Sequence, residues 1–585
     1  MLCKWPMKLS IDESKLSEGD KNNPTIQLLL EINRQQAEVI QQLKDEINRL
    51  KKHPRKPKIK PSNLEKKEKS GSKKGKRAGS EKKFKTAEIE IHHVEKIEPD
   101  DIPVGSRFVY YRDFVVQDIK IEADNTRYRL KVYETPDGEY IAGKLPENLN
   151  GKHFGPSLIR FVLYQYYHCH VTQPLLLEQL HEIGIDISAG YLNSLLIDGK
   201  ESFHQEKEDI LSVGLKVSAY INADDTGARH KGKNGYCTYI GNEVFSWFES
   251  TERKNRINFL KCLRAGHSDF YLNIDALTYM QVNKLPKDQL KLLIGHFNHM
   301  FPSQDHWDTF LTDNGIVKQR HRKIATEGAL IGSIIEHGIS DKLVIVSDDA
   351  GQFNVLRHAL CWVHAERLIS KIVVFSDQAQ KELADVKDRI WSLYNDLKNY
   401  KLNPNEKDKR RLEKIFDKIF TLKTDSATLN EALKRIHKNR AELLLVLERP
   451  DIPLHNNSAE NAIREYVKRR KISGGTRNEL GRLARDTFTS LKKTCRKLGL
   501  SFWQYLKDRI ENIGSYPTLS SLIKEQALRA AGNNKSVELP VDFDSSAGNG
   551  CPDIPKYVPK DEMNHLAQKP SSMADLFLSE SLKPG

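Results

Sequence analysis

The chain has 585 residues, of which 38% are hydrophobic, and a formal net charge of +14. This length allows several domains with cores of their own. No apolar run approaches the ~20 residues of a membrane span, and the first residues lack the apolar stretch of a signal peptide. The seven scattered cysteines include no CxxC pair, which argues for a reducing cytoplasm and against a disulfide framework or a ribbon-type zinc site.

Residues 24–50 carry a heptad pattern, with Leu29 and Leu43 at one seam position and Ile32 and Val39 at the other. The pattern spans fewer than four heptads. It predicts a short coiled coil between copies of the chain, and an amphipathic helix docked on the protein itself is the alternative.

Positive charge is concentrated in residues 51–85, which hold 16 Lys or Arg and 3 Glu. A Lys-rich segment that contains Pro and Gly cannot bury a core, so we predict a disordered basic tether that contacts nucleic-acid phosphates. A solubilising linker is the alternative. The residues expected to make these contacts are Lys51, Lys52, Arg55, Lys56, Lys58, Lys60, Lys73, Lys74, Lys76 and Arg77.

Residues 86–150 alternate apolar and polar positions and contain the turn sequence Pro136-Asp137-Gly138, which predicts a small β-rich module. Residues 151–214 change to a helical pattern. Thr172 suits a helix start, Gly184 a helix end and Ser188 the cap of a following helix. Helix, glycine-containing turn and capped helix predict a DNA-binding, helix-turn-helix-like segment; an ordinary helical hairpin is the alternative.

Carboxylates stand out at three places in the second half of the chain. An apolar, β-branched run ends at Asp224, a later apolar run at 343–346 leads into Asp348, and Glu460 lies one turn inside a helix that starts near Asn456. Acidic side chains at the ends of adjacent parallel strands, with a third from a helix across that edge, can bind Mg²⁺. Two such ions suit in-line displacement at phosphorus. Taken singly, each residue is ordinary, because strand-end Asp is usually a turn former and Glu460 with Arg464 is a typical surface pair.

Three stretches together resemble the insertion-sequence-66 family of bacterial transposases, of the TnpC type. They are NADDTGARHKGKNGYCTYIGN (222–242), IVSDDAGQFN with LCWVHAER (345–367), and LHNNSAENAIREYVKRRKISGG with the residues that follow it to 506. The resemblance implies a DDE transposase: a multidomain α/β protein with an RNase H-like core and a large all-helical insertion before the glutamate.

The same resemblance assigns the site residue by residue. Asp224, Asp348 and Glu460 match the catalytic, metal-binding triad, and the supporting residues are Arg464, Asn457, Cys361 and His364. Lys468, Arg469, Arg470 and Lys471, which follow Glu460, are expected to contact DNA. We expect a packing or DNA-positioning role for Cys361 and His364, with Trp362 buried, because two ligands are only half of a structural zinc site.

The chain departs from the family pattern at three points. Asp225 replaces the usual Glu and keeps its charge, and His455 stands where Asp commonly precedes two asparagines. Residues 86–145, where many members carry a cysteine-ligated zinc module, contain no cysteine, so we predict no zinc there.

The resemblance implies Mg²⁺-dependent cleavage at the ends of an element and strand transfer into target DNA. It implies two Mg²⁺ ions, with Mn²⁺ as a possible substitute. The expected partners are the element ends, target DNA, further copies of the chain and companion proteins of the same element, in the bacterial cytoplasm at the nucleoid and without a membrane. A catalytically inactive DNA-binding relic or regulator and a stand-alone metal-dependent nuclease are the alternatives.

The predicted division of the chain is as follows: an N-terminal segment (1–23), coiled-coil helix (24–50), basic tether (51–85), β-rich module (86–150), helical DNA-binding segment (151–214), first part of the core (215–363), helical insertion (364–450), second part of the core with C-terminal helices (451–535) and a disordered tail without an assigned role (536–585).

Overall fold

The structure is a computed structural model, and it describes residues 25–26, 91–146, 149, 152–374 and 376–533. The predicted N-terminal segment, basic tether and C-terminal tail lie outside these residues, as does the predicted coiled coil apart from residues 25 and 26. The chain divides into two units after residue 75, and every element below belongs to the second, Lys76–Gly585. Throughout the described part, each helix is too short or too polar to cross a membrane.

Residues 91–146 contain one hairpin, formed by β1 (Val132–Glu134) and β2 (Tyr140–Ala142). Its turn forms as predicted, with Gly138 at φ 79° and its N–H donating to the carbonyl of Thr135. The prediction of several strands in this region was wrong, since 91–131 holds no strand. Its apolar side chains, such as Phe108 and Phe114, are 70% and 89% exposed. Alternation predicts an amphipathic strand, but a strand also needs a neighbour and an apolar layer to pack on.

The region from 156 to 217 is helical, as predicted. The side chain of Ser188 accepts the N–H of Tyr191 at 3.2 Å, and Gly184 has φ 85° where the preceding helix stops. The expected pair of helices is therefore confirmed, while its binding to DNA stays a prediction. The elements are α3 (Pro156–Leu163), a π-helical turn η4 (Tyr164–His168), α4 (Gln173–Glu182), α5 (Ala189–Ile197) and α6 (Glu201–Val217).

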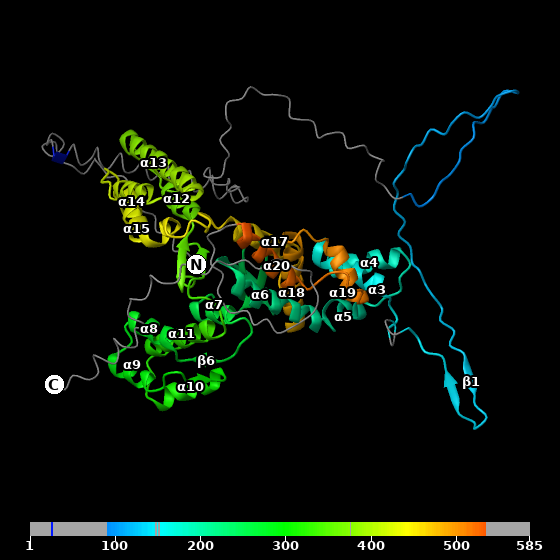
Figure 1. Ribbon diagram of the computed structural model, residues 1–585, viewed down its shortest axis with the longest axis horizontal. Helices are drawn as coiled ribbons and strands as arrows, with labels where there is room; N and C mark the ends of the chain where they lie inside the picture. The colour runs from blue at the N-terminus through cyan, green and yellow to red at the C-terminus, as the bar shows by residue number, and fades with distance from the viewer. Residues whose placement is uncertain (1–24, 27–90, 147–148, 150–151, 375, 534–585) are drawn as a thin grey trace, which may run out of the picture. The chain divides into compact units, whose positions relative to one another are not determined.

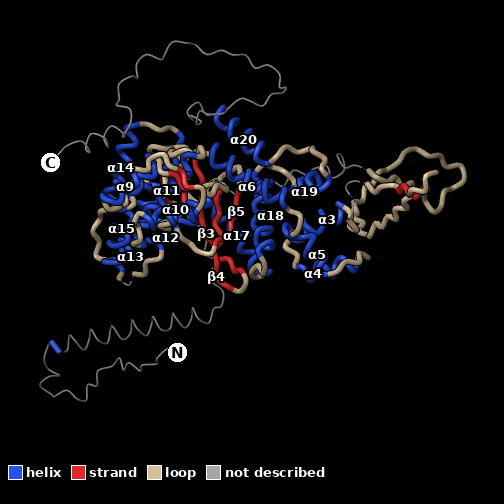
Figure 2. The backbone as a smooth tube through the Cα atoms, turned by 90° about the horizontal axis from the view of Figure 1, so that it is seen from below, coloured by secondary structure: helices blue, strands red, loops and turns tan. Residues whose placement is uncertain are grey.

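A five-stranded mixed sheet follows, in the order β5-β4-β3-β8-β9 (Figure 2). The first three strands along the chain form an antiparallel meander, and β8 and β9 add on parallel to β3. The strands are β3 (Tyr220–His230), β4 (Lys233–Gly241), β5 (Ser246–Thr251), β8 (Val344–Ser347) and β9 (Arg357–Leu360).

The prediction that the first strand ends at Asp224 was wrong. Strand β3 continues to His230, because it pairs with β4 along the whole length of a long hairpin. Its parallel pairing with β8 stops at Asn222, however, two residues before Asp224. Asp224 therefore lies just beyond the end of the parallel ladder, although it lies inside its own strand.

Between β5 and β8 the chain forms a mainly helical lobe. A two-stranded sheet, β6 with β7, lies within it, and Figure 1 shows α8, α9 and α10 grouped with α11. Its elements are α7 (Arg256–Leu263), β6 (Phe270–Tyr271), α8 (Ile274–Val282), α9 (Lys287–Ile294), β7 (Met300–Phe301), α10 (Gln304–Asp313) and α11 (Gln319–Glu336).

The described elements between β9 and α17 are all helical, as expected for the insertion. They are α12 (Trp362–Ser370), α13 (Asp377–Leu402), α14 (Glu406–Phe420), α15 (Ala427–Lys438), α16 (Arg440–Leu443) and η5 (Leu445–Leu447). Four further helices follow: α17 (Asn457–Ser473), α18 (Glu479–Lys497), α19 (Phe502–Glu511) and α20 (Leu519–Asn533).

Helix α17 packs on one face of the five-stranded sheet. Successive strand residues point to opposite faces, so Tyr239 and Phe248 join α17 in one apolar cluster while Ile240 and Trp247 join the main core on the other face. Tyr466 of α17 stacks on Phe248 with ring centroids 6.0 Å apart. This packing lays the first turn of α17, and with it Glu460, across β3.

Candidate active site

Two of the three predicted carboxylates come from neighbouring parallel strands. Asp224 lies on β3, and Asp348 directly follows β8. Burial, together with the negative charges of Asp348, Asp225 and Glu460, raises the pKa of Asp224 to about 7, and the hydrogen bond from the Asp225 N–H opposes this rise. The structure thus brings Asp348 and Glu460 within electrostatic reach of Asp224, and their negative charges disfavour the ionisation of Asp224.

Glu460 reaches the site from the first turn of α17. Its Oε1 lies 3.2 Å from Nη1 of Arg367 and 3.7 Å from Nε2 of His364, and its Oε2 lies 3.6 Å from Nη2 of Arg464. Two of these partners, His364 and Arg464, were selected from the sequence. Arg367 was not, although it follows His364 by three residues in α12 and therefore shares its helix face.

The carboxylates do not form one tight ligand cluster. Among residues 91–146, 149, 152–374 and 376–533, the one group of three His, Cys or acidic residues whose ligand atoms all lie within 4.8 Å is a different one, in the lobe before β8. Glu460 is instead paired with the guanidinium groups of Arg367 and Arg464.

Helix α17 is attached to β3 by Asn456, the residue before its first turn. The fully buried Asn456 side chain donates to the carbonyl of Ala223 at 2.8 Å and accepts from Nδ2 of Asn222 at 2.9 Å. Its backbone N–H donates to Sγ of Cys361 at 3.2 Å. Sequence reasoning selected Asn457, but it is Asn456 that bonds the strand carrying Asp224. The two consecutive asparagines in the sequence indicated a structural role at this position, but not which of the two side chains points toward β3.

Cys361 and Trp362 have the packing positions expected of them. Both are about 1% exposed, and burial raises the pKa of the Cys361 thiol to about 11, so the group is a neutral thiol. Trp362 donates its indole N–H to the carbonyl of Leu443 at 2.9 Å. Burial lowers the pKa of His364, while Glu460 opposes that effect.

The second aspartate of each pair is bonded to other residues. Asp225 accepts hydrogen bonds from Thr238 at 2.5 Å and from Nε2 of Gln352 at 2.9 Å. Asp349 pairs with Arg435 at 2.6 Å, on α15 of the helical insertion. Asp225 and Asp349 are therefore bonded to side chains outside the predicted triad.

The basic residues after Glu460 differ in their exposure. Lys468 and Lys471 are exposed, so their contact with DNA stays a prediction. Arg470 donates to the carbonyl of Gly227 on β3. Arg469 is only 5% exposed and lies over the ring of Tyr166, 3.8 Å from its centroid, and this burial argues against its direct contact with DNA. The predicted contacts from Lys51 to Arg77 lie outside the described residues.

Comparison with known proteins identifies the family. The family described as "Transposase IS66 family" matches residues 330–483. A protein of Sinorhizobium fredii (strain NBRC 101917 / NGR234), named "Uncharacterized protein y4jO", is 42% identical over 303 residues, which cover 52% of this chain and 94% of that protein. The chain belongs to the IS66 family of transposases. DNA is accordingly the substrate of this IS66-family protein.

The IS66 match contains three residues at the candidate site that lie close together in space, Asp348, His364 and Glu460. It begins within α11 and ends within α18, so it includes the whole helical insertion. Asp224, on β3, lies before the matched range. Its place in the site rests on the pairing of β3 with β8 and on its interaction with the other two carboxylates.

Proposed function

We propose that this IS66-family protein is a DDE transposase, which cuts DNA at the ends of its element and joins the freed 3′ end to target DNA. Asp224, Asp348 and Glu460 are the proposed catalytic triad. The observation that carries the proposal is that Asp224 on β3 lies within the electrostatic reach of Asp348 at the end of β8 and of Glu460 in the first turn of α17, in a protein of a transposase family. The mixed sheet, an antiparallel meander extended by two parallel strands, is compatible with an RNase H-like core.

The donor set suits Mg²⁺, which prefers a few carboxylate oxygens and keeps several waters for itself and for phosphate oxygens. Asp224, Asp348 and Glu460 would hold the ion or ions. The raised pKa of Asp224 fits this assignment, because a bound cation would offset the mutual repulsion of the three carboxylates. When bound, the metal would supply an activated water and would neutralise charge on the phosphate that is attacked. Mn²⁺ has similar ligand preferences and is the proposed substitute.

The chain's own residues orient the donors. Arg367 holds Glu460, while Asn456 fixes the start of its helix against β3. Arg367 is therefore positioned to exchange its contact with Glu460 for one with the phosphate backbone when Glu460 turns to a cation. Exposed Lys468 and Lys471, about two and three turns beyond Glu460 along α17, are proposed to contact DNA phosphates.

A strand-transfer assay tests the proposal. Purified protein is incubated with a duplex that carries the element end, a supercoiled target plasmid and Mg²⁺, and joined products are separated by size. We expect nicking at the end sequence and covalent joining to the plasmid, both lost in the presence of a chelator. Cleavage without joining would indicate a stand-alone nuclease. Binding without cleavage at any divalent ion would indicate an inactive DNA-binding relic.

A further inference from the structure

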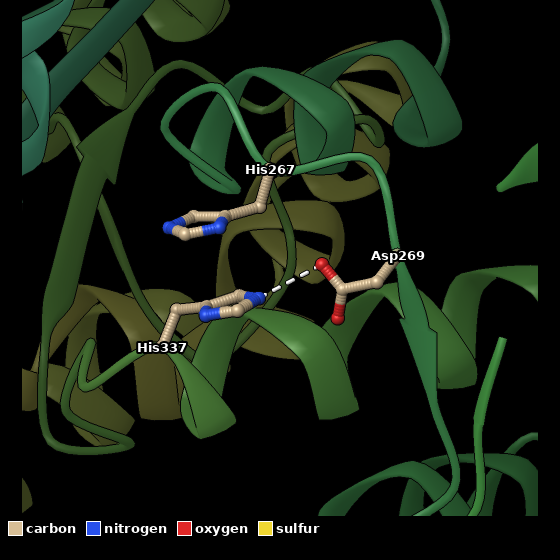
Figure 3. Close-up of side chains that lie close together, drawn as sticks. All are labelled: His267, Asp269 and His337. Carbon is tan, nitrogen blue, oxygen red and sulfur yellow. Dashed lines mark hydrogen bonds and ion pairs between the residues drawn. The ribbon is translucent and has the colours of Figure 1, made fainter. Parts of the chain in front are cut away.

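Three potential metal ligands converge in the lobe before β8, away from the carboxylate site. His267, Asp269 and His337 each offer one ligand atom, and these atoms all lie within 4.8 Å of one another. The imidazoles of His267 and His337 stack at 3.4 Å between ring centroids, with their planes 7° apart, and Nε2 of His337 lies 2.8 Å from Oδ1 of Asp269 (Figure 3). His267 is exposed and the other two are half-buried, so an ion in solution can reach the group.

Two of the three groups are shifted toward the form that binds a metal. Two stacked imidazoles cannot both carry charge at little cost, and a neutral ring nitrogen is the ligand form of histidine. Burial and the neighbouring His337 hold the pKa of His267 below its usual value. Burial raises the pKa of Asp269, but the hydrogen bond and the charge of His337 outweigh it, so this carboxyl titrates below its usual range.

The ends of two helices also favour a cation at this place. Helix α11 ends at Glu336 with His337 as its C-cap, and α7 ends at Leu263, four residues before His267. The C-terminal end of a helix carries partial negative charge.

Two positive side chains act in the opposite direction. Arg264 is buried, and it donates to the carbonyl of Asp269 at 2.6 Å and lies over the ring of Phe270. Lys216 is exposed and so is free to turn toward solvent. The Arg264 side chain is thus fixed by its own contacts, and the Lys216 side chain can move away from the three ligands.

We propose that His267, Asp269 and His337 bind a divalent transition-metal ion of the zinc type. Two imidazoles and one carboxylate form a ligand set that suits such ions better than Mg²⁺, with water at the remaining position. The ion joins the turn after α7 to the end of α11, and α11 leads directly into β8 and Asp348. It therefore braces the strand that positions one proposed catalytic carboxylate. The site is separate from the proposed active site and does not depend on its chemistry.

Metal titration of the full, untagged chain tests this site. The protein is stripped with a chelator and titrated with Zn²⁺ in competition with a chromophoric chelator, and with Co²⁺, whose absorption reports imidazole and carboxylate ligation. We expect one tight equivalent. His267→Ala should weaken it at least 100-fold and Asp269→Asn at least tenfold. The exposed side chain of His267 makes its replacement the variant that best preserves folding, and circular dichroism checks that it does.

Two matched variants make the titration decisive. His296→Ala removes another exposed histidine of the same lobe, and Asp224→Asn alters the carboxylate site; both should keep the tight equivalent. Zn²⁺ should also raise the melting temperature of the wild type and of these two controls, but not of His267→Ala. The proposal is overturned if the wild type binds no stoichiometric Zn²⁺ or Co²⁺, if His267→Ala keeps the equivalent, or if Asp224→Asn loses it.

Discussion

Glu460 is the best-connected carboxylate of the site. Arg367, His364 and Arg464 surround it, and Arg367 also donates to Nε2 of His364 at 3.3 Å. Accepting that hydrogen bond requires a neutral His364, which agrees with the lowered pKa of this group. Arg367 and Arg464 neutralise the charge of Glu460 while no metal ion is bound. A cation that enters the site therefore competes with Arg367 for the carboxylate.

A second histidine, His358, is buried next to the strand that leads into Asp348, and its protonation affects stability. His358 on β9 is 8% exposed, and burial lowers its pKa to about 4. Its Nε2 lies 2.8 Å from Oγ of Ser347, whose own hydroxyl donates to the carbonyl of Asp348. The neutral ring must therefore carry its proton on Nε2.

Because the folded protein keeps His358 neutral, we predict that the protein becomes less stable in acid. Between pH 6.5 and 4 the unfolded chain binds a proton at His358 that the folded chain does not. The stabilisation is thus complete above pH 6.5, and the free energy of unfolding falls as the pH drops, by up to about 3 kcal/mol. Denaturant unfolding across this window should show a weaker pH dependence of the free energy of unfolding in His358→Asn than in wild type.

His168 contributes to the pH dependence of both proteins, because its pKa is also lowered to about 4. The effect of His358 is therefore measured as the difference between the variant and wild type. Exposed His153→Asn should match wild type, and an equal slope in His358→Asn would contradict the assignment.

At the scale of elements, helix α17 depends on the amide of Asn456. Truncating this side chain leaves the carbonyl of Ala223 and the amide of Asn222 without a buried partner. We expect Asn456→Ala to lower the free energy of unfolding by about 2–4 kcal/mol and to reduce DNA cleavage, because Glu460 loses its register with β3.

Asn461→Ala is the matched control for Asn456, since Asn461 is exposed on the same helix and bonds only Arg464 among the described contacts. Its stability should change by less than about 0.5 kcal/mol. Unfolding curves and cleavage rates of both variants check the prediction. Equal stability and equal cleavage in the two variants would show that Asn456 does not position the helix.

Helix α18 covers the edge of the sheet. The N–H groups of Ser246, Phe248 and Ser250, at alternate positions of edge strand β5, donate to Thr494, Ser490 and Asp486 at 3.1, 2.9 and 2.7 Å. The three acceptors are spaced by four residues, so one helix face meets one strand edge turn by turn. This contact satisfies donors that would otherwise form an open edge.

The hydrogen bonds between α18 and β5 predict that removing one acceptor lowers the stability of the protein. Ser490→Ala leaves the buried N–H of Phe248 without a partner and should lower the free energy of unfolding by about 1–3 kcal/mol. Thr489→Ala should cost well under 1 kcal/mol, because the Thr489 hydroxyl bonds only the carbonyl of Arg485 in its own helix. Thermal or urea unfolding distinguishes them. A Ser490→Ala protein as stable as Thr489→Ala would contradict the edge-capping role.

Sequence patterns predicted those elements whose signals are local. Caps and turns such as Ser188 and Gly138 formed where expected, since their geometry depends on a few adjacent residues. The length of β3 beyond Asp224 could not be predicted, because it is set by pairing with β4. The contact of Arg367 with Glu460 and the inward turn of Asn456 likewise depend on residues about 90 to 230 positions away in the chain. The ligand group of His267 and His337 joins two segments 70 residues apart.

At the scale of the whole molecule, the charge of residues 51–85 predicts how the protein binds arbitrary DNA. Deleting this segment, which holds 16 Lys or Arg and 3 Glu, should lower the affinity for random duplex DNA and flatten its salt dependence. The slope of log affinity on log salt is about −0.9 per neutralised phosphate. Preference for element ends over random DNA should survive, because base readout needs ordered side chains in a groove.

Titrations on end-containing and scrambled duplexes at several salt concentrations measure both the salt dependence and the preference for element ends. An unchanged slope would make the segment a solubilising linker, and a collapsed preference would place sequence reading in the N-terminal region.

The central claim is that Asp224, Asp348 and Glu460 together perform DNA cleavage. The most direct measurement compares Asp224→Asn, Asp348→Asn and Glu460→Gln with wild type in Mg²⁺-dependent cleavage of end-containing DNA, with binding to the same duplex measured in parallel. Each substitution removes one anionic oxygen ligand and keeps the shape of the side chain. We predict that each variant loses cleavage while its DNA affinity stays within about twofold of wild type. Cleavage near the wild-type rate by any one of the three would remove that residue from the catalytic site and contradict the account.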